Sequence, residues 1–163
     1  MNFSENSKGR LIGLGLFLVY FIQALIPWKS QQLIEIQSGE SYRLWTGLLL
    51  FMVILSQWVL TYARFVLEKD GDSIQYYVRL HKLVGIYSPV IYFIHSADPG
   101  YGLLMFLTIV FFLNHLIGVA YGKSPFWVWV FPVWIILHVF LAVTLLSASV
   151  YHIYVVFAYK GCG

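Results

Sequence analysis

The longest apolar stretch of this sequence runs from Ser124 to Ala158 and reads SPFWVWVFPVWIILHVFLAVTLLSASVYHIYVVFA. These 35 residues include no Asp, Glu, Lys or Arg. One perpendicular crossing of a bilayer needs about 20 apolar residues, so the stretch is longer than a single span requires. We therefore expect it to tilt, to kink near Pro132 or to project beyond the membrane, with the aromatic run Phe126 to Trp129 at the interface.

The composition of the whole chain agrees with a membrane location. The 163 residues are 60% hydrophobic and 19% aromatic, and 10% are charged, whereas about a quarter of the residues of a soluble domain are charged. Apolar runs predict five helices, at residues 9–28, 42–67, 77–97, 101–122 and 126–158. The expected fold is an all-α integral membrane protein, a single domain over residues 1–163 with a bundle of about five transmembrane helices in contact with lipid.

Turn signals mark the ends of these helices. Pro27 closes the first, Asp98-Pro99-Gly100 separates the third from the fourth, and Gly122-Lys123-Ser124-Pro125 separates the fourth from the fifth. The two short connections predict that the last three helices are antiparallel neighbours.

The distribution of Lys and Arg predicts the orientation, because cytoplasmic loops carry more of both. With the amino terminus inside, that side holds Lys8, Arg10, Arg64, Lys69, Arg79, Lys82 and Lys123, and the other side holds Lys29, Arg43 and Lys160. This favours a cytoplasmic amino terminus, and we expect a bacterial inner membrane. The net charge of +3 therefore reflects topology, and no nucleic-acid partner is expected. Cys162 is the one cysteine, so no internal disulfide is expected.

Four of the five histidines form two pairs with the same spacing. His81 and His95 lie on the third predicted helix, and His138 and His152 lie on the fifth. Fourteen residues turn an α-helix through nearly four turns, so both members of a pair share one face and lie about 21 Å apart along the axis. One histidine of each pair is therefore expected near each side of the membrane.

The third and fifth helices should run in the same direction, which would bring His81 level with His138 and His95 level with His152. Two imidazoles on opposite sides of a haem iron make a six-coordinate site suited to electron transfer. The pattern predicts two b-type haems, with the four histidines as iron ligands. The alternative for these histidines is hydrogen bonding between packed helices.

Further residues are candidates for contacts to the haems. Small residues between the paired histidines (Gly85, Ala142, Ser147 and Ala148) suit either a flat macrocycle or close helix packing, and Pro89 is expected to kink the third helix. Arg79 and Lys82 flank His81, where they either bind haem propionates or simply mark a cytoplasmic boundary. Arg43 has the same two interpretations at the other side. His115 is expected to bind a propionate, to substitute as a ligand, to assist proton uptake or to make a helix contact.

At these histidines the chain resembles the ferric reductase and NADPH oxidase transmembrane superfamily, which includes the haem-bearing membrane subunit of bacterial methionine sulfoxide reductase. The resemblance covers residues 77–158 and is carried by His81-Lys-Leu-Val-Gly85, Tyr92-Phe-Ile-His95, His138 and His152. It implies that His81 and His138 hold an inner haem and that His95 and His152 hold an outer one. The 14-residue spacing also resembles the cytochrome b of quinol-oxidising complexes, in which the histidines lie on the second and fourth helices.

The chain is expected to depart from the first family in two ways, because we expect neither a sixth helix nor a flavin or nicotinamide domain in it. The expected function is transmembrane electron transfer within a larger complex. Its donor is expected to be a flavoprotein or quinol, and its acceptor a cytochrome, metal ion, oxygen or quinone. The acceptor decides whether the protein acts as an oxidoreductase enzyme. Two alternatives are a haem-free anchor subunit and a proton or metal-ion carrier, the latter disfavoured by the scarcity of intramembrane carboxylates.

Overall fold

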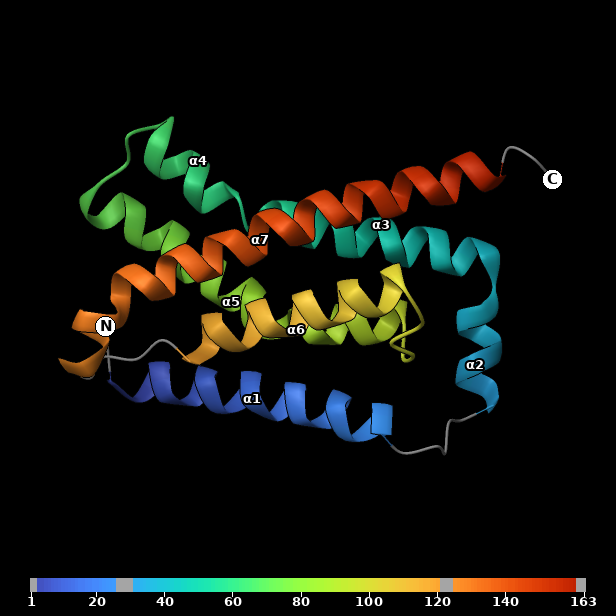
Figure 1. Ribbon diagram of the computed structural model, residues 1–163. Helices are drawn as coiled ribbons and strands as arrows, with labels where there is room; N and C mark the ends of the chain where they lie inside the picture. Colours follow the sequence, from blue (N-terminus) through green and yellow to red (C-terminus); the bar gives the residue numbers. More distant parts are fainter. Residues whose placement is uncertain (1–2, 26–30, 121–124, 161–163) are drawn as a thin grey trace. The chain divides into compact units, whose positions relative to one another are not determined.

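The computed structural model describes residues 3–25, 31–120 and 125–160, and every regular element among them is an α-helix. The helices are α1 (Phe3–Leu25), α2 (Gln31–Ser38), α3 (Glu40–Ser56), α4 (Val59–Phe65), α5 (Gly71–His95), α6 (Leu103–Ala120) and α7 (Pro125–Lys160) (Figure 1). The predicted all-α class is therefore confirmed. The expectations that concern Pro27, Lys29, Lys123 and Cys162 fall outside the described residues.

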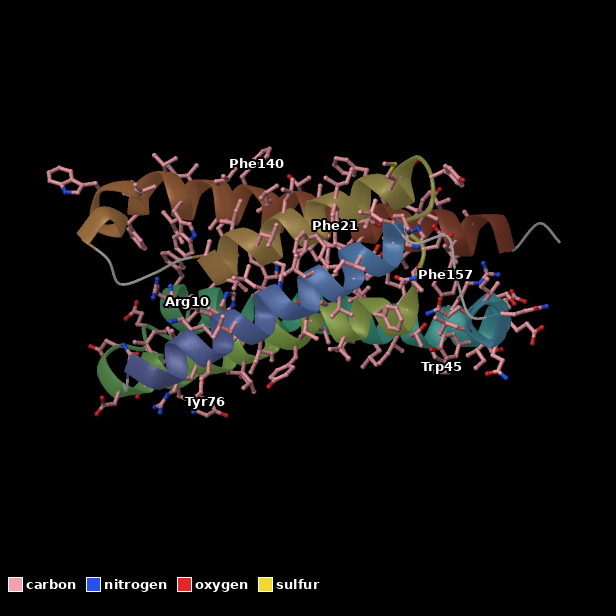
Figure 2. The ribbon with its side chains drawn as sticks, turned by 90° about the horizontal axis from the view of Figure 1, so that it is seen from below. Arg10, Phe21, Trp45, Tyr76, Phe140 and Phe157 are labelled. Atoms are coloured by element: carbon pink, nitrogen blue, oxygen red, sulfur yellow. The ribbon has the colours of Figure 1, made fainter. Side chains whose placement is uncertain are left out.

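Four segments of the described chain are long and apolar enough to cross a membrane. They are Lys8–Leu25, Glu40–Phe65, Leu103–Ala120 and Trp129–Ala158. Large apolar side chains along them are exposed, including Phe21, Met52, Leu113 and Phe140, and Figure 2 shows such side chains projecting along the helices. A surface of this kind suits lipid as the surrounding solvent. The protein is thus a multi-pass membrane protein in contact with lipid.

The chain divides into two compact units, residues 1–98 and 99–163. In the first unit, α5 packs against α1, α3 and α4. Helices α1 and α5 run in parallel, because Gly9 approaches Ile86 and Tyr20 meets Tyr92 edge to face with ring centroids 5.4 Å apart. Helix α3 runs antiparallel to α5, since its start contacts the end of α5 and its end contacts the early turns of α5.

Helix α5 is the fifth long helix, and it carries more polar residues than the four apolar segments. Its 25 residues give a length of about 37 Å, which is enough to cross a hydrocarbon core. The helix continues through Pro89, although proline has no N–H for the carbonyl four residues earlier, at Gly85. The Ser88 hydroxyl donates to that Gly85 carbonyl at 2.8 Å, which satisfies the acceptor inside the helix.

The second unit is a hairpin of α6 and α7, which pack side by side (Figure 1). The Trp134 indole Nε1–H donates to the Ile117 carbonyl at 2.8 Å and ties the end of α6 to the early part of α7. This confirms the prediction that these two helices are antiparallel neighbours. Helix α7 has 36 residues and is continuous through Pro132, and its first turns point in a different direction from the rest (Figure 1).

Two local features of the first unit differ from the predicted helix limits. The predicted helix 42–67 is divided at Gln57 and Trp58, whose N–H groups bond to the carbonyls of Ile54 and Leu55, three residues back. Bonding to the third residue rather than the fourth tightens the turn and interrupts the α-helix. The short helix α2 occupies part of the expected connection between residues 29 and 41, and it lies across the direction of α1 and α3 (Figure 1).

Candidate functional site

Each predicted histidine pair lies on one continuous helix. His81 and His95 belong to α5, and His138 and His152 belong to α7. Because neither helix is interrupted between its histidines, the 14-residue spacing corresponds to about 21 Å along the axis. All four side chains are half-buried. The two histidines of α5 both contact the α3 side of the first unit, so they share one face, as the spacing predicts.

The break between α3 and α4 places a backbone acceptor against His81. The Nδ1 atom of His81 lies 3.2 Å from the Gln57 carbonyl oxygen. A carbonyl oxygen accepts hydrogen bonds and does not donate them, so Nδ1 carries the hydrogen. In the neutral imidazole the lone pair is then on Nε2. Proteins usually orient a histidine that ligates a metal by a hydrogen bond from its other ring nitrogen, as Nδ1 makes here to Gln57.

His95 has the same protonation pattern for a different reason. Its Nδ1 atom lies 3.2 Å from the Thr46 hydroxyl oxygen. That hydroxyl lies 2.7 Å from the Tyr42 carbonyl, one turn back on α3, and it must donate its single hydrogen there. Its oxygen is left to accept from His95, so Nδ1 carries the hydrogen and Nε2 carries the lone pair in the neutral ring.

A glycine makes room for the His95 ring. A Cβ atom added to Gly47 would lie 3.0 Å from Cε1 of His95, which is shorter than an ordinary carbon contact of about 3.5–4.0 Å. Any other side chain at this position would therefore displace the imidazole or push α3 away from α5. Thr46 thus bonds the His95 ring, and Gly47 leaves space for it.

His138 is held in the second unit by an indole and a glycine. Its ring stacks on Trp134, one turn earlier on α7, with centroids 5.5 Å apart and planes 7° apart. A Cβ atom added to Gly118 of α6 would lie 3.2 Å from Cε1 of His138. His138 therefore resembles His95 in having a glycine of the neighbouring helix beside its Cε1 atom.

The remaining candidate residues differ in burial and in their hydrogen bonds. The Arg79 side chain is exposed, and its Nε–H donates to the Gln75 carbonyl of the same helix at 3.4 Å. Lys82 is half-buried next to His81. Arg43 donates to the Ser38 carbonyl at 3.0 Å, which ties the end of α2 to α3. His115 is buried on α6, with 8% of its surface exposed.

The small residues between the histidines are not alike in their surroundings. Gly85 faces Gln57, whose Oε1 would lie 3.5 Å from an added Cβ. On α7, Ala142 and Ala148 are half-buried and Ser147 is exposed. Gly85 therefore serves the approach of the α3 end to α5, next to His81.

Three buried amide atoms have no hydrogen-bond partner among the described residues. They are Oε1 of Gln23 and Nε2 of Gln57, in the first unit, and Oδ1 of Asn114, next to His115 in the second. Buried polar atoms are nearly always satisfied, and an exception calls for an unseen partner. Each atom is thus a candidate contact for a polar group of a bound cofactor or for a water molecule.

These residues fit a haem held by two histidines. No cluster of three or more His, Cys, Asp or Glu that could hold a metal ion occurs within residues 3–25, 31–120 and 125–160, but a haem iron needs only two protein ligands besides its porphyrin. His81 and His95 have the hydrogen-bonded Nδ1 atom and the Nε2 lone pair that axial ligation requires. His95 and His138 each lie against a glycine.

No family model, characterised protein or solved structure matches this chain. The functional argument therefore rests on the chain's own residues.

The positioning residues were not predicted from the sequence. Thr46, Gly47 and Gln57 contact the α5 histidines, and Gly118 and Trp134 contact His138. One signal was present, because Thr46-Gly47 is a pair of small residues within the bulky run from Leu44 to Leu55. Small residues in such a run mark a close approach of another group.

Proposed function

We propose that this chain is a transmembrane electron carrier that binds two b-type haems through the histidines of α5 and α7. His81 and His138 would ligate one haem, and His95 and His152 the other. Bis-histidine haem supplies reversible one-electron transfer at its iron. The single observation that carries the proposal is the shared state of the two α5 histidines, each with Nδ1 engaged by the α3 side and with its lone pair on Nε2.

The alternative use of these histidines is to hold helices together through hydrogen bonds to neighbouring helices. A structural histidine gains nothing from a 14-residue repeat on a second helix, whereas two ligand planes require it. The glycines beside His95 and His138 add to the argument, because they leave the rings room at the helix surface. The proposal thus accounts for the spacing, the ring orientation and the glycines together.

In this proposal the protein's own residues orient the ligands and exclude water. The Gln57 carbonyl and the Thr46 hydroxyl fix the planes of His81 and His95 and increase the basicity of their Nε2 atoms. Trp134 fixes the plane of His138 by stacking. Apolar side chains of the surrounding helices keep the local dielectric constant low, and Arg79, Lys82 and His115 are the proposed polar contacts to the haem edges.

The proposed orientation has the His81 end at the cytoplasm of a bacterial inner membrane. Several basic residues support it, because they belong to the end of the first unit where α1 and α5 begin and α4 ends. They are Lys8, Arg10, Arg64, Lys69, Arg79 and Lys82. Figure 2 shows Arg10 and Tyr76 near this end and Trp45 near the other. Electrons would come from a flavoprotein or quinol and leave to a cytochrome, metal ion, oxygen or quinone, with the chain as a subunit of a larger complex.

The pairing is tested with single and double alanine variants of the histidines. If His81 and His138 share one haem, then His81→Ala, His138→Ala and the double variant all lose the same half of the reduced alpha band. The His81→Ala and His95→Ala double variant would lose both haems. Gln32→Leu, at an exposed position of α2, is the control and should keep both. The proposal would be contradicted if the double variant of His81 and His138 lost the sum of the alpha-band losses of the two single variants. Unchanged spectra for all variants would also contradict it.

A further inference from the structure

The end of α5 next to His95 is held by side chains of α2 and α3. The last carbonyl groups of an α-helix have no partner within the helix. At α5 the Tyr92 carbonyl accepts the Ser96 N–H at 2.8 Å, and the next two carbonyls accept from outside. The Gln37 amide donates to the Phe93 carbonyl at 2.8 Å and lies 3.3 Å from that of Ile94, which also accepts the Tyr42 hydroxyl at 3.0 Å.

Gln37 also holds the residue that follows the helix. Its Oε1 accepts the Ala97 N–H at 3.0 Å. One amide therefore bonds the backbone on both sides of His95, two residues before it and two residues after it. Ala97 is buried, with 4% of its surface exposed, so its N–H has little water available as an alternative partner.

We propose that Gln37 is a positioning residue for His95, which makes the short helix α2 the element that positions the backbone of one iron ligand. This inference rests on the proposed function, because it takes His95 as an axial ligand. Thr46 fixes the ring of His95 through Nδ1, and Gln37 fixes the backbone from which that ring projects. His81, about 21 Å away on the same helix, lies too far from Gln37 to depend on it.

Selectivity for one haem follows from this placement. A change at Gln37 alters the backbone around His95 and leaves the bond from His81 to Gln57 intact. A residue that merely stabilised the whole unit would affect both haems alike. The signature of a positioning role is therefore a shift in the midpoint potential and the low-spin electron paramagnetic resonance signal of one haem, with the other unchanged.

Three variants in the full-length protein in detergent separate the contributions. Gln37→Leu removes both donor and acceptor. Gln37→Glu keeps an acceptor for the Ala97 N–H and removes the donor to Phe93. Gln32→Leu is the matched control, because Gln32 is an exposed glutamine of the same helix. Hydrogen exchange at Ala97 is measured together with the potentials and the resonance spectrum.

Gln37→Leu should speed exchange at Ala97 about tenfold, the effect of losing one hydrogen bond, and shift the potential of a single haem. Gln37→Glu should retain the protection of Ala97 and still shift the potential of the same haem, because the donor to Phe93 is lost, and Gln32→Leu should change neither readout. Unchanged exchange in Gln37→Leu would overturn the inference, and so would equal shifts of both haems or of neither. If the unmodified protein bound no haem, the proposed function would fail and the ligand role with it, while the exchange data would still report on the Gln37 contacts.

Discussion

The Nδ1 atom of His81 lies 3.2 Å from the carbonyl oxygen of Gln57, at the break between α3 and α4. A regular helix over residues 42–67 would have used that carbonyl for its own ladder. The tightened turn at Gln57 and Trp58 changes the local bonding, and the imidazole donates to the Gln57 carbonyl. The helix break and the protonation state of His81 are thus parts of one arrangement.

Replacing His81 by Asn separates the two nitrogens of this imidazole. The Asn Nδ2–H can take the place of Nδ1–H as donor to Gln57, but Asn has no counterpart of Nε2. We expect His81→Asn to lose one haem. Without haem, its thermal stability should be close to that of the unmodified apoprotein. His81→Ala should lose the same haem and a further roughly 1 kcal/mol of unfolding free energy. Equal stability of the two variants would show that the Gln57 bond contributes nothing.

Thr46 offers a matched pair of substitutions at the other histidine. Thr46→Val keeps the shape of the side chain and removes the acceptor for the His95 Nδ1–H. Loss of such a supporting bond typically weakens metal binding by about 10–100-fold. Thr46→Ser retains a hydroxyl and should bind both haems as the unmodified chain does. Haem titration of the apoprotein measures the two affinities, and equal affinities for the Val and Ser variants would contradict the role of this hydroxyl.

The space beside His95 can be tested with one methyl group. Gly47→Ala places a Cβ atom 3.0 Å from the ring, so the variant should bind one haem less tightly. Gly15→Ala is the control, because nothing lies within 4 Å of an added Cβ there, and alanine gains up to about 1 kcal/mol over glycine in a helix. Thermal unfolding and haem content are compared for both. Tight binding of two haems by Gly47→Ala would show that the ring has room to move.

Ser88 and Pro89 should be energetically coupled. The Ser88 hydroxyl donates to the Gly85 carbonyl. That carbonyl would otherwise lack a helical donor, because Pro89 has no N–H. Ser88→Ala should therefore cost about 1 kcal/mol of unfolding free energy. In a Pro89→Ala background the helix has an N–H at position 89, and Ser88→Ala should cost much less. A double-mutant cycle gives the coupling energy, and a value of zero would refute this account of how α5 continues through Pro89.

The membrane fold could be predicted because it depends on local composition. The runs from Leu11 to Leu25, Leu103 to Ala120 and Trp129 to Ala158 are mainly apolar and contain no Asp, Glu, Lys or Arg, and each lies in a helix. Helix α2 was not predicted, because eight residues with two polar ones at the start resemble a loop. The break after Ser56 was not predicted either, since neither glycine nor proline marks it.

The candidate site could be predicted only as far as local sequence patterns determine it. Helix periodicity places His81 and His95 on one face, and the structure agrees. The partners on that face come from segments 24 to 60 residues away in the sequence, as for Gln57 with His81 and Gln37 with Ala97. Such contacts depend on how α2 and α3 pack against α5, and helix periodicity carries no information about packing partners.

The haem content of the purified, unmodified protein tests the central claim most directly. We predict two haem b groups per polypeptide, both six-coordinate and low-spin, with a sharp alpha band on reduction. A preparation that is folded, helical and free of haem after expression with ample haem supply would contradict the claim, as would a single haem that survives replacement of His138 and His152 together.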